Sequence, residues 1–430
     1  MVTGVQTCAL PICTTGAEVV PFENNSIEGS NSVLERDWNR YLEDIARANK
    51  LICNIDLVTD NSLTTAERAQ YKAEAKIFRA MVMFDMVRLW GDFPVITTVA
   101  GDITSENIDE VYPQYFPEQN TELEAYQQIE RDLLDAVLYA PDNTPGNKTL
   151  FSKSVARTLL AKIYAEKPLR DYTKVIQYCD EVKADGFDLV DDFSDLFGMN
   201  AAGTDAKMRN TKESILEAQF TSGAGNWCTW MFGRDLVNWN NNFTWAKWVT
   251  PSRDLISAFK QEGDEVRFKE SIVYYDCNWS NYYPSDNYPF MYKCRSANSS
   301  IIKFRYADVL LLKAEALIMQ DTPDLEGAAD IIDKVRDRAK LGALPTSVRS
   351  NKNVLLNALL KERRLELAFE GQRWFDLVRL DKVEEVMNAV YAKDSGRKAQ
   401  IYTFDKNSYR LPIPQSVIDA NDKIHQNPGY

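Results

Sequence analysis

The fold of this chain is constrained most by capped segments whose apolar residues recur every three or four positions. The clearest covers residues 64–90, where Thr64 and Glu67 match a capping box: the Thr side chain bonds a backbone N–H and the Glu side chain reaches back. The apolar residues that follow at this spacing are Ala66, Ala69, Ala73, Ile77, Ala80, Phe84 and Val87. Gly91 then permits a left-handed ending, and Pro94 prevents the helix from resuming. The pattern predicts one long helix with a single buried face.

Similar segments dominate both ends of the sequence. We expect further helices at 32–58, 122–140, 151–167, 171–184, 304–319, 323–340, 354–370 and 372–390. The segment at 323–340 places Pro323 at its first position and Asp324 at the positive end of the helix dipole. Short turns join these segments into pairs of about the length of the ~34-residue tetratricopeptide unit. We therefore predict an all-α fold, with tetratricopeptide-like helix pairs over 32–190 and 300–430 forming a scaffold.

The stretch between the two helical parts, about residues 191–300, has a different composition. Residues 227–292 contain six Trp, five Phe and six Tyr, about a quarter of the 66 positions, against 11% aromatic residues in the whole chain. Asn is also dense there, helical periodicity is poor, and turn formers such as Gly233, Pro251 and Pro284 recur. We expect a long loop-rich, aromatic-rich excursion from the scaffold, and such loops are usually functional.

The aromatic and Asn side chains of this excursion are the candidate ligand-binding residues. Trp and Tyr rings cover the apolar C–H face of a sugar ring, and Asn hydrogen-bonds its hydroxyl groups. The candidates are Trp227, Trp230, Trp239, Trp245, Trp279, Tyr282, Tyr283, Asn278 and Asn281. The same composition also suits a protein interface, and the rings would equally fill a protein core. The residues alone leave these three interpretations open.

Charge and residue types exclude several classes of function. The 63 acidic and 50 basic residues give a net charge of −13, which argues against a nucleic-acid binder, because such proteins need a basic face. The same excess disfavours strongly anionic polysaccharides unless a local basic patch compensates. His425 is the single histidine, and motifs for nucleotide, zinc or serine-hydrolase chemistry are missing. We therefore expect no metal and no cofactor.

Three acids at helical spacing, Glu362, Glu366 and Glu370, form the one candidate for catalysis. Carboxyl groups four residues apart on a helix stand ~5–6 Å apart, and a retaining glycosidase needs ~5–5.5 Å. Interleaved arginines such as Arg363 and Arg364 would keep these acids ionised, whereas a general acid needs a raised pKa. We therefore favour a structural ion-pair network over a glycosidase.

The N-terminal segment and the cysteines give weaker signals. Residues 1–13 lack Lys and Arg, Ile12 occupies the small-residue position of a lipoprotein cleavage box, and the string VTGVQTCALPI resembles translated sequencing-adaptor sequence. We treat this segment as non-native and residues 14–430 as one domain. Cys53 and Cys179 lie among apolar residues and are expected to be buried. A disulfide between Cys277 and Cys294 is conceivable in an oxidising compartment.

Several strings together resemble the SusD/RagB family of nutrient-binding outer-membrane lipoproteins. In family order they are AKIFRA at 75–80 running to RLWGDFP at 88–94, ARTLLAKIY at 156–164 with DY at 171–172, FRYADVLL at 304–311 with AEA at 314–316, ERRLELAFEG at 362–371 with RWFDL at 373–377, and PIP at 412–414 with QNPGY at 426–430. We expect these motifs to be mostly structural. Glu362 to Gly371 would lock helices together, and Arg79 and Asp92 would fix helix ends.

The resemblance implies a function. Such proteins are all-α with tetratricopeptide-like pairs, are not enzymes, and lie at the cell surface on the outer membrane through an acylated N-terminal cysteine. They cover a SusC-like TonB-dependent transporter and deliver oligosaccharides or other nutrients to it. We therefore expect non-catalytic binding of an oligosaccharide or polysaccharide, with the lipid anchor outside this sequence. The alternatives are a helical-repeat protein-interaction adaptor and a binder of a non-glycan nutrient such as a peptide.

Overall fold

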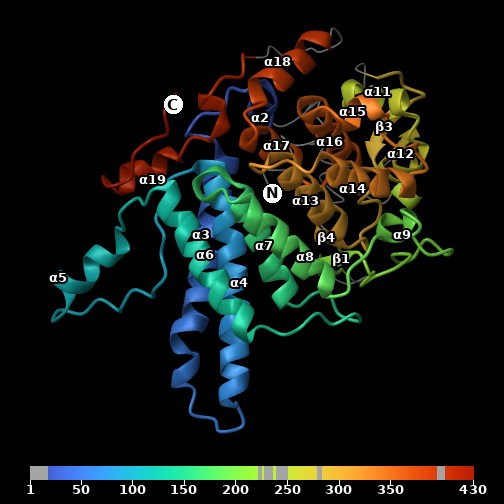
Figure 1. Cartoon of the computed structure of the whole chain (residues 1–430). Helices are drawn as coiled ribbons and strands as arrows, with labels where there is room; N and C mark the ends of the chain where they lie inside the picture. Colours follow the sequence, from blue (N-terminus) through green and yellow to red (C-terminus); the bar gives the residue numbers. More distant parts are fainter. Residues whose placement is uncertain (1–17, 221–224, 227–235, 239–249, 278–282, 395–401) are drawn as a thin grey trace. The chain divides into compact units, whose positions relative to one another are not determined.

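The computed structural model describes residues 18–220, 225–226, 236–238, 250–277, 283–394 and 402–430. The chain forms two compact units. Unit 1 contains residues up to Ser26, Thr144–Thr149 and Tyr172–Phe404, and unit 2 contains Ile27–Asn143, Leu150–Asp171 and Asp405–Tyr430. Helices predominate in both units, as the sequence predicted (Figure 1). The interpretation of residues 14–430 as one domain stays a prediction.

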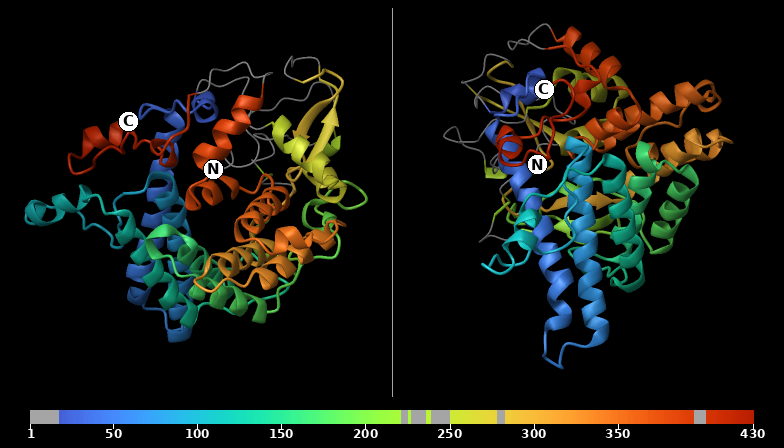
Figure 2. Two further views of the ribbon diagram at one scale, coloured as in Figure 1. Left: turned by 45° about the horizontal axis from the view of Figure 1, so that its top comes forward. Right: turned by 90° about the vertical axis from the view of Figure 1, so that its left-hand side faces the viewer.

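Unit 2 is built on a hairpin of two long helices. Its main helices are α3 (Ser32–Asn54), α4 (Thr65–Trp90), α6 (Glu122–Tyr139) and α7 (Lys153–Ala165). Helix α4 packs against both α3 and α6, and α7 packs on α6; Figure 2 shows the hairpin from two further sides. The smaller helical elements are η1 (Ile55–Leu57), α5 (Ile108–Val111), η2 (Tyr112–Tyr115), η3 (Lys167–Leu169), η5 (Asn407–Tyr409) and α19 (Gln415–Ala420).

The predicted helix at 64–90 is confirmed with its capping box and its ending at Gly91, but the prediction of a single buried face is wrong: Ala66 is exposed, and all residues from Met86 to Trp90 are buried because neighbours surround this end of the helix. Thr64 Oγ1 accepts a hydrogen bond from Glu67 N at 3.2 Å, and the Glu67 carboxylate accepts one from Thr64 N at 2.8 Å. Gly91 has a φ of 75°, which a residue with a Cβ adopts only with strain. The buried face carries Trp90, whose ring meets Trp38 of α3 edge-on at 5.3 Å between centroids.

The C-terminal residues of the chain hydrogen-bond to the C-terminal end of α4 and hold it in place. The Trp90 indole Nε1 donates to Pro412 O at 3.0 Å, and the Asn427 amide donates to Trp90 O at 2.8 Å and to Leu411 O at 2.7 Å. Asp92 accepts a hydrogen bond from Glu122 N at 2.7 Å and so fixes the start of α6, as expected. The strings PIP and QNPGY are therefore structural closures of unit 2.

Arg79 has a different role from the one predicted. It lies in the middle of α4, only 3% exposed, and its guanidinium pairs with both Asp132 oxygens at 2.8 and 2.6 Å. The same group donates to Asn49 Oδ1 at 2.6 Å and to Thr97 O at 3.2 Å. Arg79 therefore ties α3, α4 and α6 together instead of fixing a helix end.

Unit 1 consists of packed helix pairs and short strands. Helix α13 (Tyr306–Met319) is its centre and packs against α8 (Tyr172–Ala184), α14 (Leu325–Arg338) and α16 (Lys352–Glu366). The other helical elements are α2 (Val20–Asn24), α9 (Ser194–Phe197), η4 (Leu236–Asn238), α11 (Arg253–Glu262), α12 (Glu265–Ser271), α15 (Thr346–Arg349), α17 (Arg373–Arg379) and α18 (Val383–Lys393). The all-α scaffold of helix pairs is thus confirmed.

Two small antiparallel sheets interrupt the helical pattern of unit 1. Strand β1 (Ser214–Ala218) pairs with β4 (Ile301–Arg305), and β2 (Ile272–Tyr275) pairs with β3 (Tyr288–Met291). In the second sheet Ile272 faces Met291 and Tyr275 faces Tyr288. These strands lie within the predicted loop-rich excursion or at its edge. Their alternation of apolar and polar residues covers only four or five positions, so it does not stand out from the surrounding aromatic residues.

Several helix boundaries in unit 1 differ from the prediction, among them 304–319, which begins at Tyr306 after strand β4, and 354–370, which is Lys352–Glu366; two further differences have a clear local cause. The segment 372–390 is two helices, because Asp381 takes a left-handed φ of 55° and Lys382 N bonds Leu377 O at 2.8 Å, the Schellman ending of α17. A non-glycine residue at this position gives no sequence signal. The second difference is at the start of α14. Asp324 is the N-cap, because its side chain accepts a hydrogen bond from Gly327 N at 2.9 Å, and Pro323 therefore lies before the helix instead of at its first position.

The cysteine predictions have mixed outcomes. Cys179 is buried, as expected, but Cys53, in the last turn of α3, is exposed, so the prediction for Cys53 is wrong. Cys277 and Cys294 are both buried and are not joined to each other by a disulfide. The Cys294 sulfur instead accepts a hydrogen bond from the Asn226 amide at 3.1 Å.

Candidate functional site

The predicted ligand residues are only partly visible in the structure. Tyr283 is described, whereas eight of the predicted residues lie outside the described part of the chain: Trp227, Trp230, Trp239, Trp245, Trp279, Tyr282, Asn278 and Asn281. These eight therefore stay predictions. The candidate site is built here from Tyr283 and the described residues that surround it.

Tyr283 is half-buried and is held from several sides. Its hydroxyl donates to Pro251 O at 2.7 Å, and its ring meets Tyr288 of β3 edge-on at 5.7 Å between centroids. The guanidinium carbon of Arg253 lies 4.9 Å from the Tyr283 ring centroid, a cation–π distance. Arg253 itself is anchored by an ion pair with Asp394 at 2.9 Å. The ring is therefore positioned firmly and keeps only part of its surface for a ligand.

A pocket of about 460 Å³ adjoins Tyr283. One wall is helix α11, which presents Arg253, Ile256, Ser257, Lys260 and Gln261, and the other wall contains Tyr274, Tyr283 and Asn287. The α11 residues recur at intervals of three and four, so they share one face of the helix. The helix is fixed by its Ser252 N-cap, which accepts from Leu255 N at 3.1 Å, and by Leu255 and Phe259 in the core.

The lining suits a polar ligand with apolar faces. Tyr274 and Ile256 supply apolar surface, and Gln261, Asn287 and Ser257 supply amide and hydroxyl groups. Burial raises the pKa of the Tyr274 phenol, so this hydroxyl stays protonated at neutral pH and able to donate. Rings beside several hydrogen-bonding groups are what a saccharide requires, and the lining residues that the structure describes include no carboxylate or histidine.

Sequence reasoning missed most of this lining. Arg253, Lys260, Gln261, Tyr274 and Asn287 were not among the predicted ligand residues, although all lie within the excursion. The signal that would have found the first three is the spacing of polar residues on 253–262, opposite the apolar positions that face the core. The predicted residues concentrated on Trp, whereas the described pocket is lined by Tyr.

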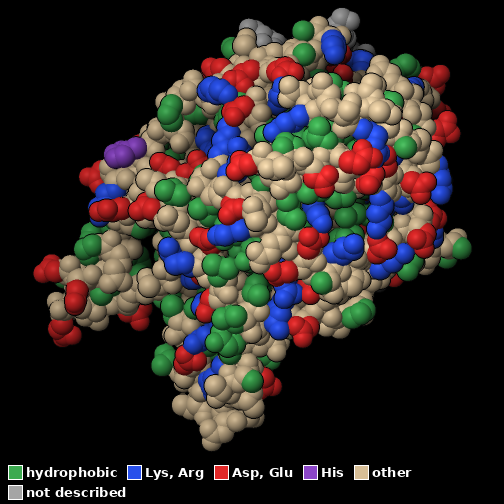
Figure 3. Space-filling model, in the orientation of Figure 1, with side chains coloured by type: hydrophobic (Ala, Val, Ile, Leu, Met, Phe, Trp, Pro, Cys, Tyr) green, Lys and Arg blue, Asp and Glu red, His purple; other side chains and the backbone are tan. Residues whose placement is uncertain are grey.

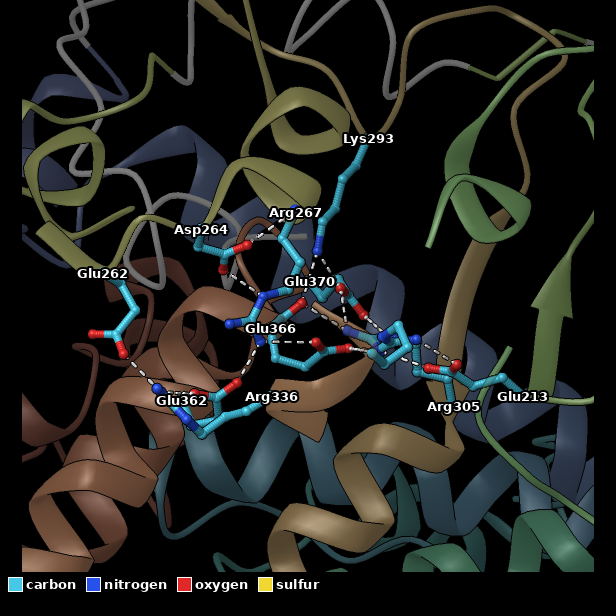
Figure 4. A network of polar contacts seen from close by, with 11 residues as sticks. Glu213, Glu262, Asp264, Arg267, Lys293, Arg305, Arg336, Glu362, Glu366 and Glu370 are labelled. Carbon is cyan, nitrogen blue, oxygen red and sulfur yellow. Dashed lines mark hydrogen bonds and ion pairs between the residues drawn. The ribbon is translucent and has the colours of Figure 1, made fainter. Parts of the chain in front are cut away.

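The three acids at helical spacing belong to a buried ion-pair network in unit 1 (Figure 4). Glu366 is fully buried and accepts hydrogen bonds from Arg305, at 2.5 Å, from Arg267, at 3.0 Å, and from Arg338. Glu362 pairs with Arg267 at 2.5 Å. The remaining members are Glu213, Asp264, Glu370, Lys293, Arg336 and Glu262. The structural interpretation of these acids is therefore confirmed.

Burial and charge act in opposite directions on these carboxyls. Burial alone would raise the pKa of Glu366, but the charges of Arg338, Arg305 and Arg267 hold this pKa well below its usual range. Burial raises the pKa of Glu362, whose main opposing charge is Arg267. Glu362 is 2% exposed and Glu366 is 0% exposed, so neither carboxyl group can reach a sugar.

The motif 362–371 also links helices, as expected. Arg363 donates to Asp308 of α13 at 2.8 Å and to both oxygens of Asp376 of α17, at 2.8 and 2.9 Å. Arg379 extends the chain of pairs to Glu315. The charged residues of this string thus have a role in packing, because removing one partner would leave an uncompensated buried charge.

The described residues contain no group of three or more His, Cys, Asp and Glu side chains arranged to hold a metal ion. None of their helices combines the length and apolarity that crossing a membrane requires.

Sequence comparison identifies relatives over nearly the whole chain. The SusD family model matches residues 288–430, and a model described as "Starch-binding associating with outer membrane" matches residues 14–165. SusD-like protein P2 of Formosa agariphila is 28% identical over 456 residues, covering 95% of this chain and 83% of that protein. Starch-binding protein SusD of Bacteroides thetaiotaomicron is 24% identical over 447 residues, covering 88% of this chain and 76% of that protein.

Solved structures share the fold. A laminarin-binding SusD-like protein superposes with a TM-score of 0.76 at 23% identity, covering 100% of this chain and 94% of its own. Surface glycan-binding protein A from Bacteroides thetaiotaomicron, solved with laminarihexaose, gives 0.77 at 18% identity, covering 99% and 93%. With two family models matching its two ends and relatives spanning most of its length, the chain belongs to the SusD family.

Proposed function

We propose that this protein binds an oligosaccharide or polysaccharide at the cell surface without cleaving it. The observation that carries the proposal is its membership of the SusD family, in which one relative is named a starch-binding protein and two structural neighbours are named for laminarin or glycan binding. The pocket beside Tyr283 supports it, since tyrosine rings and amide groups are the chemistry that a saccharide needs. The predicted Trp and Asn residues would extend this surface.

The proposal includes the place of the protein in nutrient uptake. The model matching residues 14–165 is described as associating with the outer membrane, which supports an outer-membrane surface location. Delivery of the bound glycan to a SusC-like TonB-dependent transporter is the partner function that the family resemblance implies. The direct test is co-purification of the tagged protein with a co-expressed SusC-like transporter; a transporter that elutes alone would contradict this part.

The absence of catalysis is also part of the proposal. The candidate catalytic acids Glu362 and Glu366 are buried and bonded to arginines. A general acid must contact the glycosidic oxygen, and these groups have no open side. Reducing-end assays on each bound polysaccharide should therefore show no hydrolysis, and hydrolysis that disappears in Glu362→Gln would overturn the proposal.

Glycan binding is tested by native gels cast with neutral and acidic polysaccharides. Retardation by one polysaccharide class, followed by calorimetric titration with its oligosaccharides, is the expected result. A folded protein that no polysaccharide retards would contradict glycan binding and favour a peptide or other nutrient. The variants Trp230→Ala and Trp279→Ala distinguish a glycan binder from a helical-repeat adaptor. If the rings bind glycan, both variants should abolish retardation. If the protein is an adaptor, both variants should keep their affinity for the protein partner in saturating sugar.

A further inference from the structure

The charge of the pocket beside α11 is opposite to that of the chain. The whole chain carries a net charge of −13, and acidic and basic side chains are intermixed on the face that Figure 3 shows. The pocket instead has two ionisable cations in its lining, Arg253 and Lys260, and no carboxylate among its described lining residues. A positively charged pocket in an acidic protein favours a negatively charged ligand at that place.

The carboxylates nearest to this pocket are engaged elsewhere. Asp254 pairs with Arg364 at 2.6 Å, and Glu262 pairs with Arg336 at 2.7 Å; Figure 4 shows Glu262 directed toward Arg336. Asp394 bonds Arg253 from the other flank of α11. Asp286, in the loop before Asn287, does not line the pocket. Arg253 is therefore compensated by Asp394, and Lys260 is the lining cation with which no described carboxylate forms an ion pair.

Lys260 is the group that remains for a ligand. It is exposed, and within the part of the chain that the structure describes no carboxylate forms an ion pair with it. Arg253 has one guanidinium nitrogen on Asp394 and its carbon over Tyr283, so it borders the same space. An ammonium group beside tyrosine rings and amides matches a sugar that bears an anionic substituent.

The basic character continues across α11. A second hollow of about 830 Å³ on the other flank of the helix shares Arg253, Ser257 and Gln261 with the first pocket. Its other lining groups include Lys361, Arg364 and Lys393 against Asp254 and Asp394. Arg253, Arg364 and Lys361 are paired with Asp394, Asp254 and Glu262. Among the described lining groups, Lys393 is therefore the cation that a chain of sugar units over α11 would meet on this side.

We propose that the glycan bound by this protein is acidic and that Lys260, with Arg253, contacts a carboxylate or sulfate group of a sugar unit in the pocket between α11, Tyr274 and Tyr283. This inference rests on the proposed glycan-binding function and names its substrate class. It reverses the expectation from overall composition, because a ligand responds to the local potential of its pocket and not to the net charge of the chain.

The test uses the whole chain and three probes of similar length: trigalacturonate, a carrageenan tetrasaccharide and laminaritetraose. They carry carboxylate, sulfate and no charge, so the two acidic arms separate the two sources of anion. Affinities are measured by calorimetry at 50 and 300 mM NaCl, after native gels with the parent polysaccharides. We expect one acidic probe to bind, to weaken with salt, and to bind roughly tenfold more weakly to Lys260→Met, the loss of one charge-assisted hydrogen bond.

The matched control is Lys352→Met, which removes an equally exposed lysine from the start of α16 and should leave every affinity unchanged. Lys260 lies at the surface, so its replacement leaves the fold intact, which circular dichroism verifies. Binding of an acidic probe that Lys260→Met does not weaken would overturn the inference. Binding of laminaritetraose alone would also overturn it and leave the proposed function standing, whereas a protein that binds no glycan in gels or solution would remove both.

Discussion

The buried network around Glu366 provides the sharpest test of how this fold is held together. Glu366 is 0% exposed and its carboxylate accepts hydrogen bonds from three arginines, two of which lie on α14 and β4. Glu366→Gln keeps the size of the side chain but removes the negative charge, and an amide cannot accept from all three donors. Breaking a buried pair by removing one partner costs about 3–5 kcal/mol.

The measurable consequence is a lower melting temperature. One kcal/mol shifts the midpoint by about 2–4 °C for a unit of 150–250 residues, so a loss of about 3–5 kcal/mol should make Glu366→Gln melt roughly 6–20 °C below the parent chain. The assay is far-UV circular dichroism with urea titration in parallel. The control is Glu326→Gln, whose carboxylate is 73% exposed and pairs with Arg349; an exposed pair contributes about 0–1 kcal/mol. A loss no larger in Glu366→Gln than in Glu326→Gln would refute the reasoning.

Three further predictions concern pH, the helix start and the ligand surface. The pKa of Glu366 is held below its unfolded value, so its stabilising contribution is complete above about pH 4.3 and is lost as the pH falls through the folded pKa; the parent chain should lose more melting temperature between pH 5 and pH 3 than Glu366→Gln does. Thr64→Ala removes the cap of α4 and should cost about 1 kcal/mol in urea unfolding, while Ser62→Ala, two residues outside the cap, should cost less than half of that. Tyr283→Ala should weaken glycan binding several-fold, because the pocket loses a ring, and Tyr283→Phe should retain most of the affinity; equal affinities of the two variants would contradict a stacking role.

The sequence predicted the scaffold well because local signals and burial agreed there. The capping box at Thr64 and the apolar stripe of α4 each determine the same helix, and the interleaved arginines of ERRLELAFEG pointed correctly to ion pairs. The failures have a common cause. The break at Asp381 depends on a left-handed residue with no glycine signal, and the role of Arg79 depends on Asp132, which is 53 residues away. Such partners are decided by tertiary packing, which periodicity does not contain.

The candidate site was harder to predict for a related reason. The density of aromatic residues located the excursion. It directed the prediction to the Trp residues, however, and not to the face of α11 that lines the described pocket. Arg253, Lys260 and Gln261 line the pocket only because α11 turns its other face, with Leu255 and Phe259, into the core. That orientation is a property of packing against neighbouring elements, and composition cannot report it.

The family motif and the variable pocket are connected through α11. The helix is joined to α16 by Asp254–Arg364 and by Glu262, which bonds both Lys361 and Arg336. These contacts draw the acidic side chains of α11 toward the helical scaffold, and the cationic and amide side chains are left facing the pocket. Glu362 and Glu366, on the same α16, bind Arg267 of α12 and so hold the helix that follows α11. The motif around Glu366 therefore contributes mainly to positioning: through these ion pairs it determines which face of α11 lines the pocket. On this argument, substitutions along 253, 257, 260 and 261 can change ligand chemistry while the scaffold stays constant, which is how one fold can serve different substrates.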